Sequence, residues 1–177
     1  MDPNFYQDFP AAPDLYVVDR ALHAELARRL PPELQKRAAP ALEAMGQATA
    51  NELPRLMVEC EAQEPVHVPY DPWGRRVDEI RMSRAWDELK RFSAEHGVVA
   101  TGYDQSYGEH RRVVQAGLLH LFSASSAIFS CPLAMTDAAA RVLLDTATPA
   151  LRDRLVPKLL SREAKSFITS GQWMTER

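Results

Sequence analysis

Histidine and cysteine, two residue types that often carry out chemistry, are sparse in this chain, and their spacing matches no catalytic pattern. The five histidines share no ligand spacing with a carboxylate or a cysteine; they are His23, His67, His96, His110 and His120. Glu59, Cys60 and His67 could offer oxygen, sulfur and nitrogen to a metal ion, but scattered core and surface positions explain them better. No serine lies in a G-x-S-x-G turn, and no glycine-rich phosphate loop occurs. These residues alone therefore predict no metal site and no catalytic residue.

A local group of arginines beside two tryptophans is a second candidate site. It comprises Arg75, Arg76, Arg81 and Arg84, near Trp73 and Trp86. Acidic residues alternate with them along the chain; these are Asp71, Asp78, Glu79, Asp87 and Glu88. Mixed charges of this kind are more typical of a solvated face with ion pairs than of a phosphate-binding groove. The net charge of −3 also disfavours a nucleic-acid-binding domain, which usually has a basic excess.

Composition indicates one soluble, globular domain. A chain of 177 residues is long enough to bury a core. The two cysteines, Cys60 and Cys131, lack CxxC spacing and suit the reducing cytoplasm. The sequence after Met1 has no secretory signal pattern. The longest apolar run, from Val113 to Phe129, contains Gln115 and His120, so a buried helix is expected there in place of a membrane span.

Prolines and glycines divide most of the chain into amphipathic segments. Helices are expected at about residues 19–30, 32–50, 53–60, 83–96 and 109–129, with two more beginning at Ser130 and Thr148. Residues 1–18 contain several aromatic residues and no helical period, which predicts an extended arm that lies on a partner surface, with a frayed terminus as the alternative. Residues 65–82 are expected to be irregular because prolines and Gly74 interrupt them. The fold class is therefore mainly α, a helical bundle.

Two further expectations concern the C-terminal part of the chain. Ser130 precedes Cys131-Pro132 and is expected to cap a helix. The apolar side of that helix is expected to face inward; it comprises Met135, Ala138, Ala139, Val142 and Leu143. The final stretch, "ITSGQWMTER", turns β-branched and aromatic after a charged helix, which predicts a strand. An unpaired apolar strand invites aggregation, so we expect its partner strands in a longer polypeptide or in another chain.

Three segments resemble the acyl-CoA dehydrogenase family in order and spacing. They are "SCPLAMTDAAARVLL", "TPALRDRLVPKLLSREAK" and "FITSGQWMTER". The AidB-like branch fits best, because its members share the aromatic arm, a "DPWGRRVDEI" type of loop and a Cys-Pro before the following helix. The resemblance spans about residues 3–177. It implies an arm at 1–18, the family's helical N-terminal domain at 19–164, and the truncated start of a flavin-binding β-domain at 165–177.

The resemblance also implies a chemistry. Members of the family use FAD to dehydrogenate an acyl thioester between its α and β carbons. By resemblance, Gln172, Met174 and Thr175 bind the cofactor, with Thr175 placed to hydrogen-bond the reduced flavin; the alternative for Thr175 is a structural role in a β-turn. The catalytic base of the family belongs to its C-terminal domain, so no residue here receives that role. The resemblance therefore predicts that this chain alone is inactive and does not hold FAD.

The acyl-CoA substrate is expected to lie against the segment "FSCPLAMT". By resemblance, Phe129, Cys131 and Met135 line the acyl pocket, while the small residues Ser125, Ser126 and Ala127 leave room beside it. The alternative is ordinary core packing, which requires the same residue types. Acyl chain length and electron acceptor stay open.

Partners follow from the same resemblance. A homo-tetramer is implied for the complete protein, with no membrane association. DNA is possible through the family, although this acidic portion does not support it. The other alternative is an interaction module that completes a split flavoenzyme.

Overall fold

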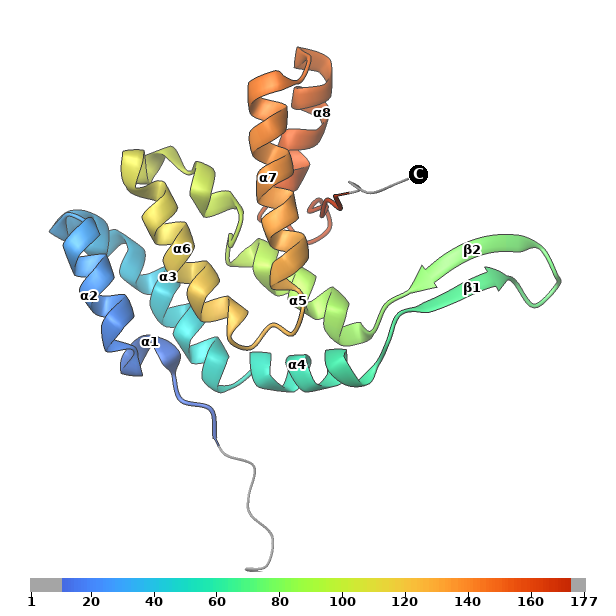
Figure 1. Cartoon of the computed structure of the whole chain (residues 1–177), viewed down its shortest axis with the longest axis horizontal. Coiled ribbons are helices and arrows are strands. Elements are labelled where there is room, and N and C mark those ends of the chain that lie inside the picture. Colours follow the sequence, from blue (N-terminus) through green and yellow to red (C-terminus); the bar gives the residue numbers. More distant parts are fainter. Residues whose placement is uncertain (1–10, 173–177) are drawn as a thin grey trace, which may run out of the picture.

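The computed structural model describes residues 11–172 and shows a helical bundle with one projecting hairpin (Figure 1). The first four helices are α1 (Leu15–Val18), α2 (Arg20–Arg29), α3 (Pro32–Ala50) and α4 (Leu53–Ala62). Two strands follow, β1 (Val66–Tyr70) and β2 (Arg76–Arg81). The remaining elements are α5 (Arg84–Glu95), the 3₁₀ turns η2 (Ala100–Tyr103) and η3 (Gln105–His110), α6 (Arg111–Ser123), α7 (Ser130–Thr146) and α8 (Pro149–Leu159). The predicted mainly helical fold is confirmed.

Local sequence signals account for several helix boundaries. Pro32 occupies the first turn of α3, where its missing N–H costs nothing. Ser83 caps α5 by accepting a hydrogen bond of 3.2 Å from the Trp86 amide. Gly97 follows α5 with a φ of +63°, the left-handed conformation that glycine adopts without steric cost.

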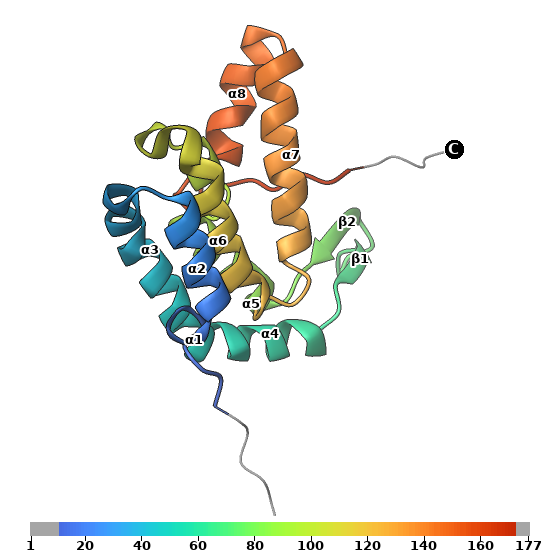
Figure 2. The same ribbon diagram turned by 60° about the vertical axis from the view of Figure 1, so that its left-hand side comes forward.

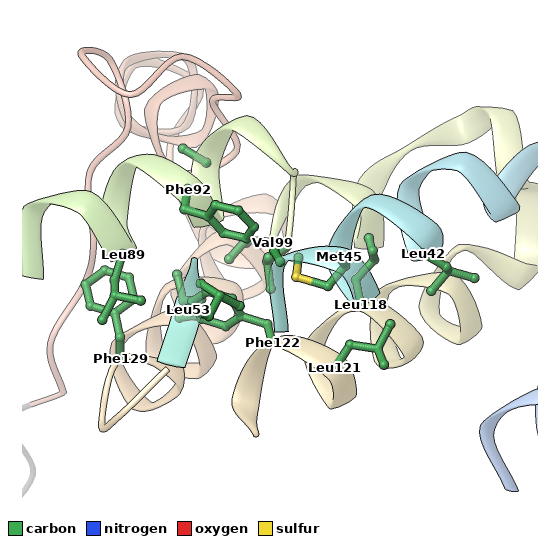
Figure 3. Packing of buried hydrophobic residues seen from close by; sticks show 14 of the residues in the cluster. Leu42, Met45, Leu53, Leu89, Phe92, Val99, Leu118, Leu121, Phe122 and Phe129 are labelled. Atoms are coloured by element: carbon green, nitrogen blue, oxygen red, sulfur yellow. The ribbon is translucent and has the colours of Figure 1, made fainter. Parts of the chain in front are cut away.

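The core lies where α3, α4, α5 and α6 pack together (Figure 3). Its largest fully buried members include Leu42, Met45, Leu53, Leu89, Leu118, Leu121, Phe122 and Phe129. The rings of Phe92 and Phe122 stack with centroids 6.1 Å apart. Each fully buried side chain of this size contributes roughly 1.5–3 kcal/mol through removal from water. This cluster holds the helices that carry the site.

The described part of the predicted arm is not fully extended. Asp14 caps α1, and the α1 segment packs against α3. The Leu15 amide donates to the Thr49 hydroxyl at 3.1 Å, and this hydroxyl donates to the Gly46 carbonyl at 2.6 Å. The periodicity of Leu15–Val18 is too short to be read as a helix from sequence; its long-range contact with Thr49 stabilises the turn.

The close approach of α1 to α3 depends on Gly46. A Cβ atom at residue 46 would fall on the carboxylate of Asp14 and the Cβ of Tyr16. We therefore expect Gly46→Ala to lower the free energy of unfolding by about 1–3 kcal/mol, the usual cost of overpacking. Urea denaturation measures this change. Gln47→Ala, on the exposed side of the same helix, is the control, and an equal effect of both substitutions would contradict the docking of α1.

The prediction of an irregular segment at 65–82 was wrong, because these residues form an antiparallel hairpin. β1 pairs with β2 so that Val66 lies opposite Arg81 and Val68 opposite Glu79, with a bulge before Tyr70. The hairpin projects away from the helices, and both of its strands are largely exposed (Figure 1). In the sequence, Pro69 argues against a strand. In the structure, Asp78 has a φ of +46°, which departs from regular strand geometry.

The helix predicted at 109–129 is shorter than expected. It ends at Ser123, and a loop leads to α7, with Ala127 at a φ of +47°. Ser130 is not an N-cap: it is the first residue of α7, and the residue before it, Phe129, already has helical backbone angles without a side-chain capping bond. The chain turns after Ser123 because Ala127 adopts a left-handed backbone conformation. Alanine is not a typical turn residue, so the sequence does not indicate this turn.

Helices α7 and α8 form a pair that rises from the rest of the bundle (Figure 2). After α8 the chain returns past Phe167, which is buried, toward α7. Residues 167–172 have no regular secondary structure, so the strand predicted near the C-terminus is not formed within the described residues. A strand is defined by hydrogen bonds to a neighbouring strand, and residues 11–172 offer none there.

Candidate functional site

Helix α7 is apolar on two opposite sides. Its buried side comprises Leu133, Thr136 and Ala140, which face the bundle. Cys131, Met135, Ala138 and Val142 recur at i, i+4, i+7 and i+11, so they form one stripe on the other side. Cys131 is exposed, Met135 and Ala138 are partly exposed, and Val142 retains 57% of its exposure. We call these four residues the outer stripe.

The outer stripe corrects the predicted orientation of α7. Met135, Ala138 and Val142 were expected to face inward, together with Ala139 and Leu143, but none of these five residues is buried. A helix with apolar residues on both sides has no sequence signal for which side meets the core. An exposed apolar side of a helix is a surface that a ligand or another protein can cover.

The last described residues lie against the N-terminal half of α7. The Ser170 amide donates to the Thr136 hydroxyl at 3.0 Å, and the Gln172 amide donates to Met135 Sδ at 3.4 Å. Upstream, a hydrogen bond of 3.1 Å joins Arg162 to the hydroxyl of Thr101. The structure thus brings together Gln172, a predicted cofactor residue, and Met135, a predicted substrate residue. Met174 and Thr175, the other predicted cofactor residues, lie outside the described residues.

The three predicted substrate residues do not share one surface. Cys131 and Met135 belong to the outer stripe, whereas Phe129 is completely buried. The Phe129 ring meets Trp86 edge to face, with centroids 4.8 Å apart. Phe129 therefore packs in the core and supports the start of α7 from below.

A small cleft of about 130 Å³ separates α6 from α7. It is lined by Val98, Val99, Gln115, Leu119, Leu133, Ala134 and Asp137. At its polar end, Arg112 pairs with Asp137 at 2.7 Å and also donates to the side-chain oxygen of Gln115. The Arg112 guanidinium lies 4.5 Å from the centre of the Tyr103 ring. This group clamps α7 to α6, and its pattern in the sequence is spread over about 35 residues, so sequence reasoning missed it.

Tyr103 is the anchor of this clamp. Its hydroxyl donates to the Asp137 backbone carbonyl at 2.8 Å. Burial, and then the nearby Asp137 side chain, raise the pKa of Tyr103 to about 12, so the hydroxyl keeps its proton at neutral pH. The group is therefore a permanent donor that fixes α7, and it is not poised for proton transfer.

The other chemical candidates from the sequence stay apart. Residues 11–172 contain no group of three histidine, cysteine or acidic side chains that could hold a metal ion. The arginine group is paired with acids as expected: Arg76 with Asp78, Arg81 with Glu79, and Arg84 with Glu59. None of the helices in this part of the chain has the length and hydropathy needed to span a membrane.

Comparison with known proteins agrees with this architecture. The described fold is that of the helical N-terminal domain of acyl-CoA dehydrogenases. Residues 8–165 match the family model of the adaptive response protein AidB N-terminal domain. The chain therefore belongs to the AidB N-terminal domain family.

Two curated relatives are named as acyl-CoA dehydrogenases. Acyl-CoA dehydrogenase family member 11 of Caenorhabditis elegans is 36% identical over 178 residues, which cover 98% of this chain and 29% of the worm protein. The putative acyl-CoA dehydrogenase AidB of Escherichia coli K12 is 30% identical over 141 residues, covering 75% of this chain and 26% of that protein. The chain thus spans less than a third of each relative.

Two solved structures superpose closely on the chain. Bd2924 in its apo form has a TM-score of 0.94 and 51% identity, over 98% of this chain and 35% of that chain. C. elegans ACDH-11 in complex with C11-CoA has a TM-score of 0.92 and 35% identity, over 100% of this chain and 30% of that chain. The second of these proteins thus binds an acyl-CoA.

Proposed function

We propose that the chain is the N-terminal part of an FAD-dependent, acyl-CoA dehydrogenase-like flavoprotein that dehydrogenates an acyl thioester between its α and β carbons. One observation carries this proposal. The outer stripe of α7 presents an open apolar surface, and the segment that leads to the predicted cofactor residues is hydrogen-bonded to the same helix.

The outer stripe has the properties required of one wall of an acyl-tail site. From Cys131 to Val142 it extends for about 16 Å along the helix, and it carries no charge. A tail laid along it loses contact with water, which contributes about 0.8 kcal/mol for each buried CH₂ group. The outer stripe is open on its far side, so further protein must complete the site. Cys131 and Met135 would contact the tail directly, whereas the buried Phe129 would support the wall.

The residues near Gln172 fit a flavin in chemical type. Gln172 is exposed and uncharged, and its backbone amide donates a hydrogen bond to Met135 Sδ. By residue type, Gln172, Met174 and Thr175 offer only neutral donors, and neutral donors stabilise negative charge on a bound ring without competing for protons. Bound FAD would supply the hydride acceptor of the reaction. The part of this chain would be to hold the ring beside the outer stripe.

The division of labour leaves the catalytic base elsewhere. Partly buried Tyr103 keeps its proton, and no carboxylate lies on the outer stripe. We expect further protein, in the same polypeptide or in another chain, to supply the base and the rest of the cofactor site. A homo-tetramer is the assembly we propose for the complete protein. The free cysteines fit a reducing compartment such as the cytoplasm.

A second function is favoured by the same open surface. The chain could serve as an interaction module, in which the outer stripe binds the helices of a partner that completes a split flavoenzyme. DNA association receives no support from this portion, since the arginines near the hairpin pair with acidic neighbours.

The first test asks what the chain binds alone and what it binds when completed. We expect purified chain to be colourless and to leave the fluorescence of added FAD unchanged, because it offers only one edge of the site. A chimera would join residues 1–177 to C. elegans ACDH-11 in place of its matching 30%. We expect this chimera to bind C11-CoA, as measured by calorimetry.

The controls separate the outcomes. Native ACDH-11 gives the reference affinity, and the chain without the added part gives the background. A folded chimera that does not bind C11-CoA would contradict the proposed function. Stoichiometric FAD on the chain alone would contradict the expectation that the cofactor site is incomplete.

A further inference from the structure

Thr136 joins the helix that carries the outer stripe to the segment that carries Gln172. Its side chain is completely buried. Its hydroxyl donates to the Pro132 carbonyl at 2.7 Å and accepts from the Ser170 amide at 3.0 Å. A threonine hydroxyl has one donor and two acceptor sites, so both bonds form at once. The donor bond fixes the direction of the oxygen, and the acceptor bond fixes the segment.

The other contacts of the segment do not set its position as tightly. Phe167 is buried three residues before Ser170, and the Ile168 amide donates to the Lys158 carbonyl at 3.3 Å. Beyond these contacts, Gln172 is held by a sulfur atom, which is a weak acceptor. Thr136 is therefore the oxygen acceptor that holds the segment nearest to Gln172 in the described chain.

We propose that Thr136 is a positioning residue that sets the spacing between the acyl-tail wall and the cofactor edge. Met135 and Thr136 are adjacent on α7, and they bind the amides of Gln172 and Ser170, which are two residues apart. A shift of the segment would therefore move Gln172 relative to Met135. The inference deepens the proposed function and rests on it, because the spacing between Met135 and Gln172 matters only if both residues serve one site.

Hydrogen exchange on the chain as it stands measures the link directly. Thr136→Val keeps the shape of the side chain and removes the hydroxyl, and we expect the Ser170 amide to exchange about tenfold faster. Thr136→Ser restores the hydroxyl and is expected to restore protection. Thr146→Val is a matched control, since the Thr146 hydroxyl makes the same bond to a carbonyl four residues back, at 2.8 Å, and has no distant partner among residues 11–172.

A second variant keeps the test decisive if Thr136→Val disturbs the core. Ser170→Pro removes the amide donor and leaves Thr136 in place. We expect it to speed exchange at the Gln172 amide while core amides, such as that of Leu118, keep their protection. Unchanged exchange at Gln172 in this variant, or at Ser170 in a folded Thr136→Val variant, would overturn the inference.

The chimera with ACDH-11 separates this inference from the proposed function. We expect Thr136→Val to weaken C11-CoA binding about tenfold and Thr136→Ser to keep it within about twofold. Normal binding by the Thr136→Val chimera would overturn the positioning role alone. Failure of the chimera that retains Thr136 would overturn the proposed function and, with it, this inference.

Discussion

Replacing Phe129 by alanine is expected to lower the free energy of unfolding by about 3–5 kcal/mol. The Phe129 side chain is fully buried and meets Trp86 edge to face at 4.8 Å, directly below the first turn of α7. Its removal leaves a cavity that the surrounding helices cannot fill by collapse, because Trp86 and α7 are fixed by other contacts. Urea or thermal denaturation of the chain measures the loss.

The neighbouring residue provides the control. Ile128 is also large and apolar, but it is 67% exposed, and we expect Ile128→Ala to change stability by less than about 0.5 kcal/mol. Equal, small effects at both positions would place Phe129 outside the closed core. Such a result would return Phe129 to the acyl-pocket wall that the family resemblance predicts.

The second large effect is expected at Cys131, where phenylalanine should change specificity with little change in stability. Cys131 begins the outer stripe and is exposed, so a larger side chain meets no packed neighbour in the chain alone. In the ACDH-11 chimera it would take space from the acyl tail. One methylene in a hydrophobic pocket is worth about 10–200-fold in discrimination, so we expect a shift of at least tenfold toward shorter acyl-CoA chains.

The measurement compares binding of acyl-CoA esters of increasing length by the chimera and its Cys131→Phe variant. Ala150→Phe, on the exposed start of α8, controls for an added aromatic side chain. If Cys131→Phe lowers the melting temperature sharply and leaves chain-length preference unchanged, Cys131 is a core residue and the wall assignment is wrong.

Local chemistry predicted several of the helix boundaries. Pro32 marked the start of α3, and Ser83 with Gly97 enclosed α5. Such signals lie within a few residues of the feature they specify, so they can be identified in a single sequence. The end of α6 at Ser123 was not predicted. Ala127 adopts a left-handed conformation in the structure, but alanine in the sequence is typical of a helix.

The orientation of α7 could not be predicted for a different reason. Leu133 and Val142 lie on opposite sides of the helix and are both apolar, so the pattern does not identify the core side. Packing against the rest of the bundle decides it. The hairpin was missed because its strands lack a buried side, and alternation of polar and apolar residues signals a strand only where one side is buried.

The candidate site was predicted only in part. Gln172, Cys131 and Met135 were named through the family resemblance, and the structure brings Gln172 to Met135. Thr136 was not singled out, since its role depends on a partner 34 residues away. The sequence does not distinguish a threonine hydroxyl that binds a distant segment from one that only donates to a carbonyl of its own helix.

The projecting hairpin also bears on how the domain can evolve. Because β1 and β2 pair with each other and lie outside the core, substitutions at their exposed side chains leave the packing of the bundle intact. Selection for folding of the bundle therefore acts weakly on the exposed side chains of residues 66–81, and any contact that they make with another surface becomes the main constraint. The resemblance of its "DPWGRRVDEI" segment to the AidB-like branch is therefore expected to reflect a constraint other than the folding of the bundle.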